Sequence, residues 1–407
     1  MSTAIAAPPP AAPTARLSDR DALALYQDCS IHELGRQAHA VTLRLHPEPY
    51  RTYVVDRNIN YANYCTAKCI FCNFKADPPG LNTGRKDLPD GYVLTFQEIG
   101  RKIEELLAIG GTQVLMQGGL VPAELLPFSW YLDLLRFMKR EFPAIHVHAF
   151  SPPEIYAFSE IFGMSVRDVL LRLREAGLDS IPGGGAEILV DRVRRKIAQG
   201  KTTVEQYLHV MREAHRIGMK TSITMMFGHI ETVEERIGHL KVVRDLQDET
   251  DGFTAFISWT FQPGDTPLGR VTRFQPGYTG PPDGKHLVLA DAGEYLRMLA
   301  VSRLYLDNIR NIQSSWVTQG VKIGQLALFF GANDMGSVMM EENVVSAAGT
   351  TYSLSEADIR EAVQASLRLR GFVVTSAMDG QEALRKVKSD RPDLVLLDLN
   401  LPKKDGR

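Results

Sequence analysis

Short apolar runs alternate with longer amphipathic stretches along most of the chain. Runs rich in β-branched and other apolar residues predict strands, and they include TYVVDRNINY, TQVLMQGG, IHVHAF, SIPGGGAEIL, KTSITMMFGH and GFTAFISWTFQ. The intervening stretches place apolar residues three and four positions apart, which predicts helices such as TFQEIGRKIEELLAIG and SVRDVLLRLREAG. Repeated strand, helix, strand order over roughly 280 residues favours an α/β fold with a (β/α) TIM-type barrel.

An open, doubly wound sheet is the alternative to the barrel. Polar and glycine-rich residues fall at most of the predicted strand ends, where barrel enzymes carry their chemistry. No G-x-G-x-x-G motif opens a helix after the first predicted strand, as it does in nucleotide-binding doubly wound sheets. Both observations favour the barrel.

The pattern divides the chain into four regions. Residues 1–16 are rich in Ala and Pro without apolar periodicity, which predicts a disordered tail. Residues 17–50 have helical spacing, with Ser18 as the N-cap of the first helix, and predict a helical lead-in. Residues 51–363 contain the barrel and the apolar region after it, and residues 364–407 form a further αβ extension.

The composition favours a cytoplasmic protein with a small-molecule partner. Four cysteines in 407 residues are too few for a disulfide framework, so we expect a reducing compartment. A formal net charge of -2 gives no basic surface for nucleic acid. The N-terminus has no apolar signal segment, and no run reaches about 18 apolar residues, so no association with a membrane is expected.

Three of the four cysteines lie close together in the run NYCTAKCIFCNF. Cys65, Cys69 and Cys72 have the spacing C-x3-C-x2-C, while Cys29 lies in a predicted helix as a structural thiol. Structural zinc usually takes four ligands from paired motifs, and no second pair follows in the sequence. Three thiolates can instead hold a 4Fe-4S cluster and leave one iron open. Zinc and redox-active thiols stay as alternatives.

Residues at other predicted strand ends are further candidates for binding a ligand. Paired glycines allow a close backbone approach, a carboxylate can bind ribose hydroxyls, and an arginine can bind a carboxylate. Ordinary turns, solvated helix charges and core histidines are the alternatives for these residues, and Ser151 is expected in a loop with Glu154. The candidates are Gly118, Gly119, Ser151, Glu187, Arg194, His229, Glu231 and Asp334.

The cysteine spacing, with Phe71 just before the last cysteine, resembles the radical S-adenosylmethionine superfamily. The resemblance implies that S-adenosylmethionine chelates the open iron and that one electron cleaves it to a 5′-deoxyadenosyl radical. It also implies that Glu187 binds the ribose and that Arg194 binds the methionine carboxylate. The other implied cofactor contacts are Phe71, Gly118, Gly119 and Ser151.

Longer runs within residues 17–363 narrow this resemblance. DRNINYANYCTAKCIFCNF, AGLDSIPGGGAEIL, MMFGHIET and GANDMGSVMMEENVVSAAG resemble the cyclic dehypoxanthinyl futalosine synthase family of the futalosine route to menaquinone. The resemblance implies hydrogen abstraction at ribose C4′ of dehypoxanthine futalosine, attack on its benzoate ring, and a one-electron reductant such as flavodoxin or ferredoxin. His229, Glu231 and Asp334 are candidates for the base and the benzoate site. Aminofutalosine synthase is the alternative activity.

Residues 364–407 depart from this pattern. They resemble part of a response-regulator receiver domain, with a helix from Gly380 to Ser389 and with Asp398 at the phosphoacceptor position. The fragment lacks the acidic pair that holds Mg²⁺ beside a phosphoryl group, so no phosphorylation of Asp398 is expected. A fusion, frameshift or assembly junction near residue 365 is the expected origin, and a signalling protein is the remaining alternative function.

Overall fold

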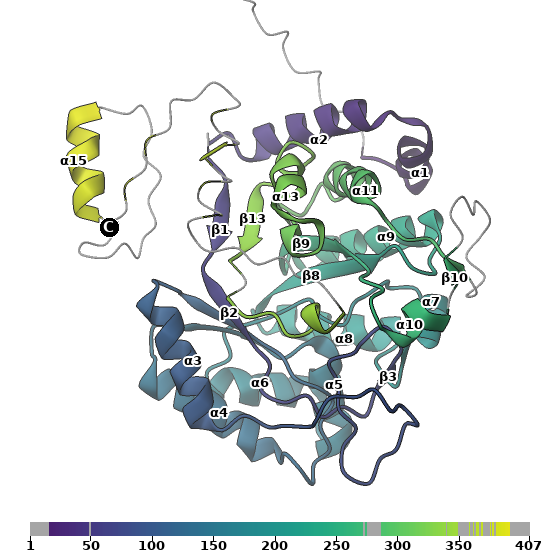
Figure 1. Ribbon diagram of the computed structural model, residues 1–407, viewed down its shortest axis with the longest axis vertical. Helices are drawn as coiled ribbons and strands as arrows, with labels where there is room; N and C mark the ends of the chain where they lie inside the picture. Colours follow the sequence, from purple (N-terminus) through teal and green to yellow (C-terminus); the bar gives the residue numbers. More distant parts are fainter. Residues whose placement is uncertain are drawn as a thin grey trace, which may run out of the picture.

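The computed structural model is built around a central parallel sheet. It describes residues 16–48, 50–271, 273–274, 286–338, 340–348 and 380–390, with isolated positions between 358 and 377. Within these residues a nine-stranded sheet has the order β1-β13-β12-β9-β8-β6-β5-β4-β2, and all its strand pairs are parallel. Figure 1 shows the helices arranged around this sheet.

One extended segment closes the sheet into a barrel. β1 (Thr52–Val54) and β2 (Asp56–Ile59) are consecutive halves of this segment. β1 pairs with β13 (Asp334–Ser337), while β2 pairs with β4 (Gln113–Met116) at the other end of the strand order. Because β1 and β2 together occupy one position, the nine strands fill eight positions around the barrel, which are called staves below. This arrangement confirms the predicted barrel over the open sheet.

The other staves alternate with covering helices, and all but β12 fall in predicted strand runs. These staves are β5 (His146–Ala149), β6 (Ser180–Ile181), β8 (Lys220–Phe227), β9 (Phe253–Thr260) and β12 (Asn311–Gln313). The main covering helices are α3 (Phe96–Ala108), α4 (Phe128–Glu141), α5 (Pro152–Phe162), α6 (Val166–Ala176), α8 (Val204–Arg216), α9 (Val233–Thr250) and α11 (Ala292–Tyr305). β6 is shorter than the run that predicts it, because the chain leaves the sheet at the glycines after Ile181.

Short elements complete the described fold. The helical ones are α7 (Asp191–Ile197), α10 (Pro267–Val271), α12 (Trp316–Gln319), α13 (Val321–Ala327) and the 3₁₀ helix η1 (Ser346–Ala348). Two small sheets join β3 (Lys68–Cys69) to β7 (Ala198–Gln199) and β10 (Arg273–Phe274) to β11 (His286–Leu287).

Two helices precede the barrel. α1 (Asp19–Asp28) begins after Ser18, whose side chain accepts from the Asp21 N–H, so the predicted N-cap is confirmed. α2 (Ile31–Leu45) packs along α11, and α1 contacts α9 and α11. Residues 1–15 of the predicted tail lie outside the described residues.

The start of α5 corrects one expectation. The sequence places Ser151 and Glu154 in a loop, but α5 begins at Pro152 and includes Glu154. Proline is well suited to the first turn of a helix, because its fixed φ matches the helix and its missing N–H needs no partner there. Ser151 is the N-cap of this helix.

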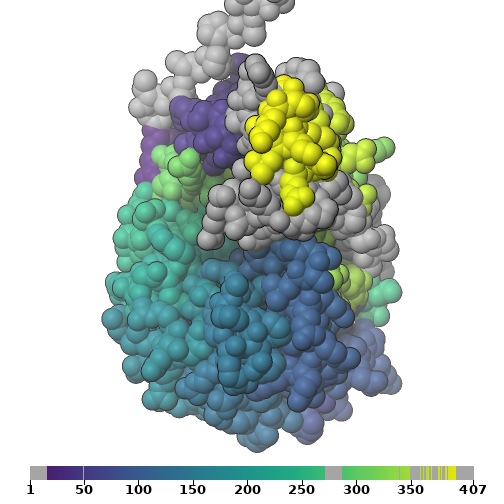
Figure 2. Space-filling model, turned by 90° about the vertical axis from the view of Figure 1, so that its left-hand side faces the viewer, coloured from purple at the N-terminus to yellow at the C-terminus, as the bar shows by residue number. Residues whose placement is uncertain are grey.

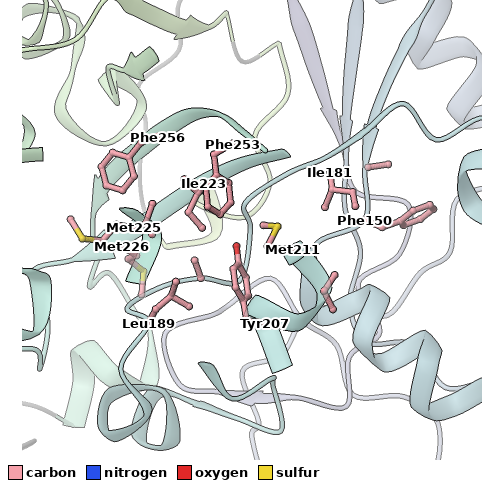
Figure 3. Packing of buried hydrophobic residues seen from close by; sticks show 14 of the residues in the cluster. Phe150, Ile181, Leu189, Tyr207, Met211, Ile223, Met225, Met226, Phe253 and Phe256 are labelled. Carbon is pink, nitrogen blue, oxygen red and sulfur yellow. The ribbon is translucent and has the colours of Figure 1, made fainter. Parts of the chain in front are cut away.

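Apolar residues fill the layer between the staves and their helices. Figure 3 shows Tyr207 and Met211 of α8 near Ile223 of β8 in this cluster. Tyr207 also donates from its hydroxyl to the Gly183 carbonyl at 2.8 Å, which ties α8 to the loop after β6. Among the described helices, none is both long and apolar enough to cross a membrane.

The C-terminal extension includes one described helix. α15 (Gly380–Asp390) confirms the helix predicted from Gly380 to Ser389. It lies outside the barrel on the side of β1 in Figure 1, and Figure 2 shows it at the surface on that side. The predicted phosphoacceptor, Asp398, lies outside the described residues, so its lack of phosphorylation stays a prediction.

Candidate active site

The cysteine loop, residues 60–76, follows β2 at the carboxyl end of the barrel. β3 within this loop pairs antiparallel with β7, and Cys69 lies opposite Ala198. The Thr66 N–H donates to the Leu120 carbonyl at 3.0 Å, which ties the loop to the segment after β4. The loop therefore lies at the edge where parallel barrels carry their chemistry.

All three predicted metal ligands lie in this loop. Cys65 and Cys69 are buried, and Cys72 is partly exposed. Burial raises the pKa of Cys65 and of Cys69, and the neighbouring thiols add to both shifts. The Leu120 N–H donates to the Cys65 sulfur at 3.3 Å. Such a contact favours the thiolate over the thiol.

The donor set fits a four-iron cluster. The loop offers three soft thiolate donors, two of them buried. Structural zinc usually takes four such ligands. A 4Fe-4S cluster takes one thiolate on each iron and so separates its ligands. Three thiolates on one loop, with a fourth iron left for a chelating small molecule, match this chemistry.

Gly118 and Gly119 follow β4 and pack directly against the cysteine loop. A Cβ on Gly119 would lie 2.1 Å from the Tyr64 carbonyl oxygen and 2.7 Å from Cys65 Cβ. A Cβ on Gly118 would lie 2.4 Å from the Tyr61 ring. The pair therefore allows the cysteine loop itself to approach closely. Its contact with a cofactor stays a prediction.

Ser151 and Glu154 connect α5 to the same loop. Ser151 Oγ donates to Glu154 Oε2 at 2.6 Å, and Glu154 Oε1 accepts from the Tyr61 hydroxyl at 2.6 Å and the Gly118 N–H at 3.0 Å. Glu154 is 1% exposed, and burial raises its pKa. These contacts give Ser151 a structural task, so its predicted contact with a cofactor remains untested.

Glu187 lies beside the cysteine loop as a buried anion. Its φ of 41° is a conformation that non-glycine residues rarely adopt. Its carboxylate accepts from Lys201 Nζ at 2.9 Å and from Arg194 Nη1 at 3.3 Å. Burial would raise the pKa of Glu187, but the charges of Lys201 and Arg194 outweigh it, so the pKa is lowered. Glu187 therefore stays ionised, and its predicted binding of a ribose stays a prediction.

Arg194 is enclosed by the protein. Its guanidinium donates to the Ala186 carbonyl at 2.6 Å, the Gly185 carbonyl at 3.0 Å and the Thr202 carbonyl at 2.9 Å. Arg194 is only 2% exposed. The geometry argues against its predicted role as the partner of a methionine carboxylate, because its donors already hold the loop around Glu187. The other cation that contacts Glu187, Lys201, is absent from the sequence prediction.

Phe71 lines a narrow pocket at the barrel mouth. Lys201 Nζ lies 5.3 Å from the centroid of the Phe71 ring, which is a cation–π distance. This position beside Cys72 fits the predicted cofactor contact of Phe71. The other residues that line the pocket are Cys72, Met226, Trp259, Phe261, Gln262, Val344, Val345 and Ala348.

The pocket wall that carries Val344 and Val345 belongs to the segment 340–348, which crosses from β13 to the cysteine loop. Glu342 fixes this segment, since it accepts from the Val344 N–H at 2.7 Å and the Val345 N–H at 2.6 Å. It also accepts from Asn58 Nδ2 of β2 at 3.1 Å. The segment therefore contributes apolar surface to the barrel mouth.

His229 and Glu231 form a buried turn after β8. Glu231 accepts from the Gly228 N–H at 2.6 Å, the His229 N–H at 2.9 Å and Arg236 Nε at 2.8 Å. Burial would raise the pKa of Glu231, but His229 and Arg236 lower it below its usual range. His229 is fully buried, and its Nε2 faces the Met226 carbonyl at 3.1 Å. The geometry argues against a catalytic base here, because both side chains are occupied in folding the turn.

Asp334 lies at the opposite end of the barrel from the cysteines. It is the first residue of β13 and pairs in register with Thr52, the first residue of β1. Its carboxylate accepts from the Thr52 hydroxyl and from the Gly336 N–H. This position corrects the expectation of a catalytic Asp334, because the amino ends of the staves face away from the site.

Three family models match successive parts of the chain. Residues 59–243 match the model of the radical SAM superfamily, and residues 250–375 match that of the CofH/MqnC C-terminal region. Residues 355–407 match the response regulator receiver domain. The second match extends past the predicted boundary at residue 363, and the receiver match confirms the resemblance of the C-terminal extension.

Known relatives decide the family. The chain is 43% identical to a cyclic dehypoxanthine futalosine synthase of Halalkalibacterium halodurans over 91% of this chain and 95% of that protein. The chain belongs to this family of radical S-adenosylmethionine enzymes. The family uses a 4Fe-4S cluster and S-adenosylmethionine, so the predicted cofactors are confirmed.

One further sequence relative and one solved structure are similar to the chain. An aminodeoxyfutalosine synthase of Thermus thermophilus is 39% identical over 82% of this chain and 84% of that protein. The crystal structure of a methylornithine synthase has a TM-score of 0.62 and 18% identity, and covers 89% of this chain and 95% of that one. At that identity the likeness shows the barrel fold alone.

Proposed function

We propose that this chain converts dehypoxanthine futalosine to its cyclic form in menaquinone synthesis. The observation that carries the proposal is a loop with three cysteines spaced C-x3-C-x2-C at the carboxyl end of a barrel, in a chain similar to cyclic dehypoxanthine futalosine synthases along nearly its whole length. The reducing partner is a one-electron donor such as flavodoxin or ferredoxin, and the expected compartment is the cytoplasm.

Cys65, Cys69 and Cys72 would hold the cluster, and Glu187 would bind the ribose of the cofactor. When bound, the cluster and S-adenosylmethionine supply a 5′-deoxyadenosyl radical that removes hydrogen from C4′ of the substrate ribose. The sugar radical would add to the benzoate ring, and loss of one proton to a base and of one electron would restore aromaticity. That electron replaces the one spent in cleaving S-adenosylmethionine, so it would return to the oxidised cluster and no further oxidant is needed. The product is therefore two hydrogen atoms lighter than the substrate.

The barrel mouth supports this chemistry by excluding water. Trp259, Phe261, Val344 and Val345 surround the pocket with apolar surface next to Cys72. A dry pocket protects a carbon radical from side reactions.

Turnover tests the proposal directly. The protein is reconstituted anaerobically with iron and sulfide, and is then mixed with S-adenosylmethionine, dithionite and dehypoxanthine futalosine. We expect 5′-deoxyadenosine and the lighter product by mass spectrometry, and neither from Cys69→Ala. Stoichiometric zinc without iron in the wild-type protein would overturn the proposal.

Aminofutalosine synthesis is the second candidate, since the Thermus relative carries that activity in its name. That reaction adds the radical to an enolpyruvyl ether. Parallel incubation with the enolpyruvyl substrate separates the two candidates. Turnover of that substrate alone would replace the proposed function.

A further inference from the structure

Lys201 is a cation held directly beside the cysteine loop. It follows β7, the strand that pairs with β3, and its side chain is 18% exposed. Its ammonium lies 2.9 Å from Glu187 Oε1 and 5.3 Å from the centroid of the Phe71 ring. It is within electrostatic reach of Cys65, Cys69 and Cys72.

Lys201 is one of several cations near the cysteine loop, and the others are directed to other partners. Lys75, within the loop, donates to the Cys65 and Ala67 carbonyls and pairs with Asp77, and Arg85 donates to the Cys72 carbonyl and to Asn73. Arg194, on α7, directs its donors to backbone carbonyls and to Thr202 as well as to Glu187. Arg236, on α9, is paired with Glu231 and Glu294. Glu187 also acts on Cys69, as an anion. At the sulfur atoms, the positive charge of Lys201 therefore offsets the negative charge of Glu187.

We propose that Lys201 is a positioning residue that raises the reduction potential of the cluster bound by the three cysteines, an inference that rests on the proposed function. Reduction by a one-electron donor adds one electron to the cluster and makes or breaks no bond to the protein. The added negative charge is stabilised by a fixed cation at short range, and more strongly in a poorly solvated site. Lys201 also neutralises Glu187, which would otherwise disfavour the added electron.

The test is a redox titration of the reconstituted protein without S-adenosylmethionine, followed by the electron paramagnetic resonance signal of the reduced cluster. In Lys201→Met we expect the ratio of reduced to oxidised cluster at a fixed potential to fall at least tenfold. For a one-electron couple this equals a midpoint about 59 mV more negative. Lys201→Arg keeps the charge and should stay near the wild-type value. Lys196→Met removes an exposed charge from α7 and is the matched control.

Iron and sulfide content is measured in every sample, so that the outcomes are separated. A wild-type protein without a cluster would overturn the proposed function itself. A fully loaded Lys201→Met with an unchanged midpoint would overturn the inference alone, and a defect seen only with S-adenosylmethionine present would assign Lys201 to the cofactor carboxylate instead. Lys201→Gln is measured in parallel. Loss of the cluster from both neutral variants, with Lys201→Arg loaded, would overturn the inference in favour of a role in loop assembly.

Discussion

Gly119→Ala should displace the cysteine loop, because the new methyl group meets backbone rather than a flexible side chain. The added Cβ would lie 2.1 Å from the Tyr64 carbonyl oxygen, and real Cβ atoms essentially never approach closer than 3.0 Å. The segment after β4 that contains Gly119 and the cysteine loop at Tyr64 must therefore move apart by about 0.9 Å. Overpacking of this kind costs about 1–3 kcal/mol of unfolding free energy.

Gly119→Ala should disturb the cluster site as well as lower the stability of the fold. Cys65 Cβ, 2.7 Å from the added methyl, must move with Tyr64. We therefore expect Gly119→Ala to lower the unfolding free energy by about 1–3 kcal/mol and to reduce the iron retained after reconstitution. Denaturant unfolding followed by circular dichroism and an iron assay measure the two effects.

Gly238→Ala is the matched control for this experiment. Gly238 lies inside α9, and its added Cβ would have Val190 Cγ2 as its nearest neighbour, at 4.0 Å. The same change should raise stability here by about 0.5–1 kcal/mol, since alanine favours a helix over glycine. Wild-type stability and iron content in Gly119→Ala would refute the argument that this glycine is required by close backbone approach.

Two further predictions concern buried carboxylates. Glu231→Gln should lower the unfolding free energy by about 3–5 kcal/mol, because it breaks a buried ion pair with Arg236; the exposed Glu234→Gln should change it by less than about 0.5 kcal/mol. Lost turnover at unchanged stability would instead support a catalytic Glu231. Burial raises the pKa of Asp56 to about 6 in the folded protein, from an ordinary value of 3.8. Between these two pH values the folded protein keeps a proton that the unfolded chain releases. As pH rises from about 4 to about 6, the unfolding free energy of the wild-type protein should therefore fall by about 3 kcal/mol compared with that of Asp56→Asn. A pH-independent stability difference between the two proteins would contradict this.

Most staves and helices of the barrel could be predicted, because an apolar run or a helical apolar stripe marks them; the short β12 and β13 could not, since three or four residues carry no clear pattern. The helix α3 carries an apolar stripe with a capping box at Thr95 and Glu98, and β4 and β8 are apolar runs between polar turns. The start of α5 was missed, because two prolines after Ser151 resemble a loop as much as a first helical turn.

The cysteines could also be predicted, since three thiols at fixed spacing within one loop carry their own geometry. Lys201 could not, because a single lysine after a glycine has no local signature. Its position depends on β7 pairing with β3, which are short strands far apart in the sequence. Contacts of this kind are set by tertiary structure, and periodicity carries no information about them.

The remaining site residues show why carboxylates at strand ends mislead a sequence reading. Irregular loops at the barrel mouth leave backbone N–H groups that need partners when they are buried. Glu154 accepts from the N–H groups of Gly118 and Ser151, Glu231 from those of Gly228 and His229, and Glu342 from those of Val344 and Val345. A buried glutamate that folds a loop and one that performs catalysis have the same sequence pattern. The two kinds differ in their donors: Glu231 accepts from two backbone N–H groups and from Arg236, while Glu187, among the residues that the structure describes, accepts only from the side chains of Lys201 and Arg194. Glu187 is therefore the better candidate for a ligand contact.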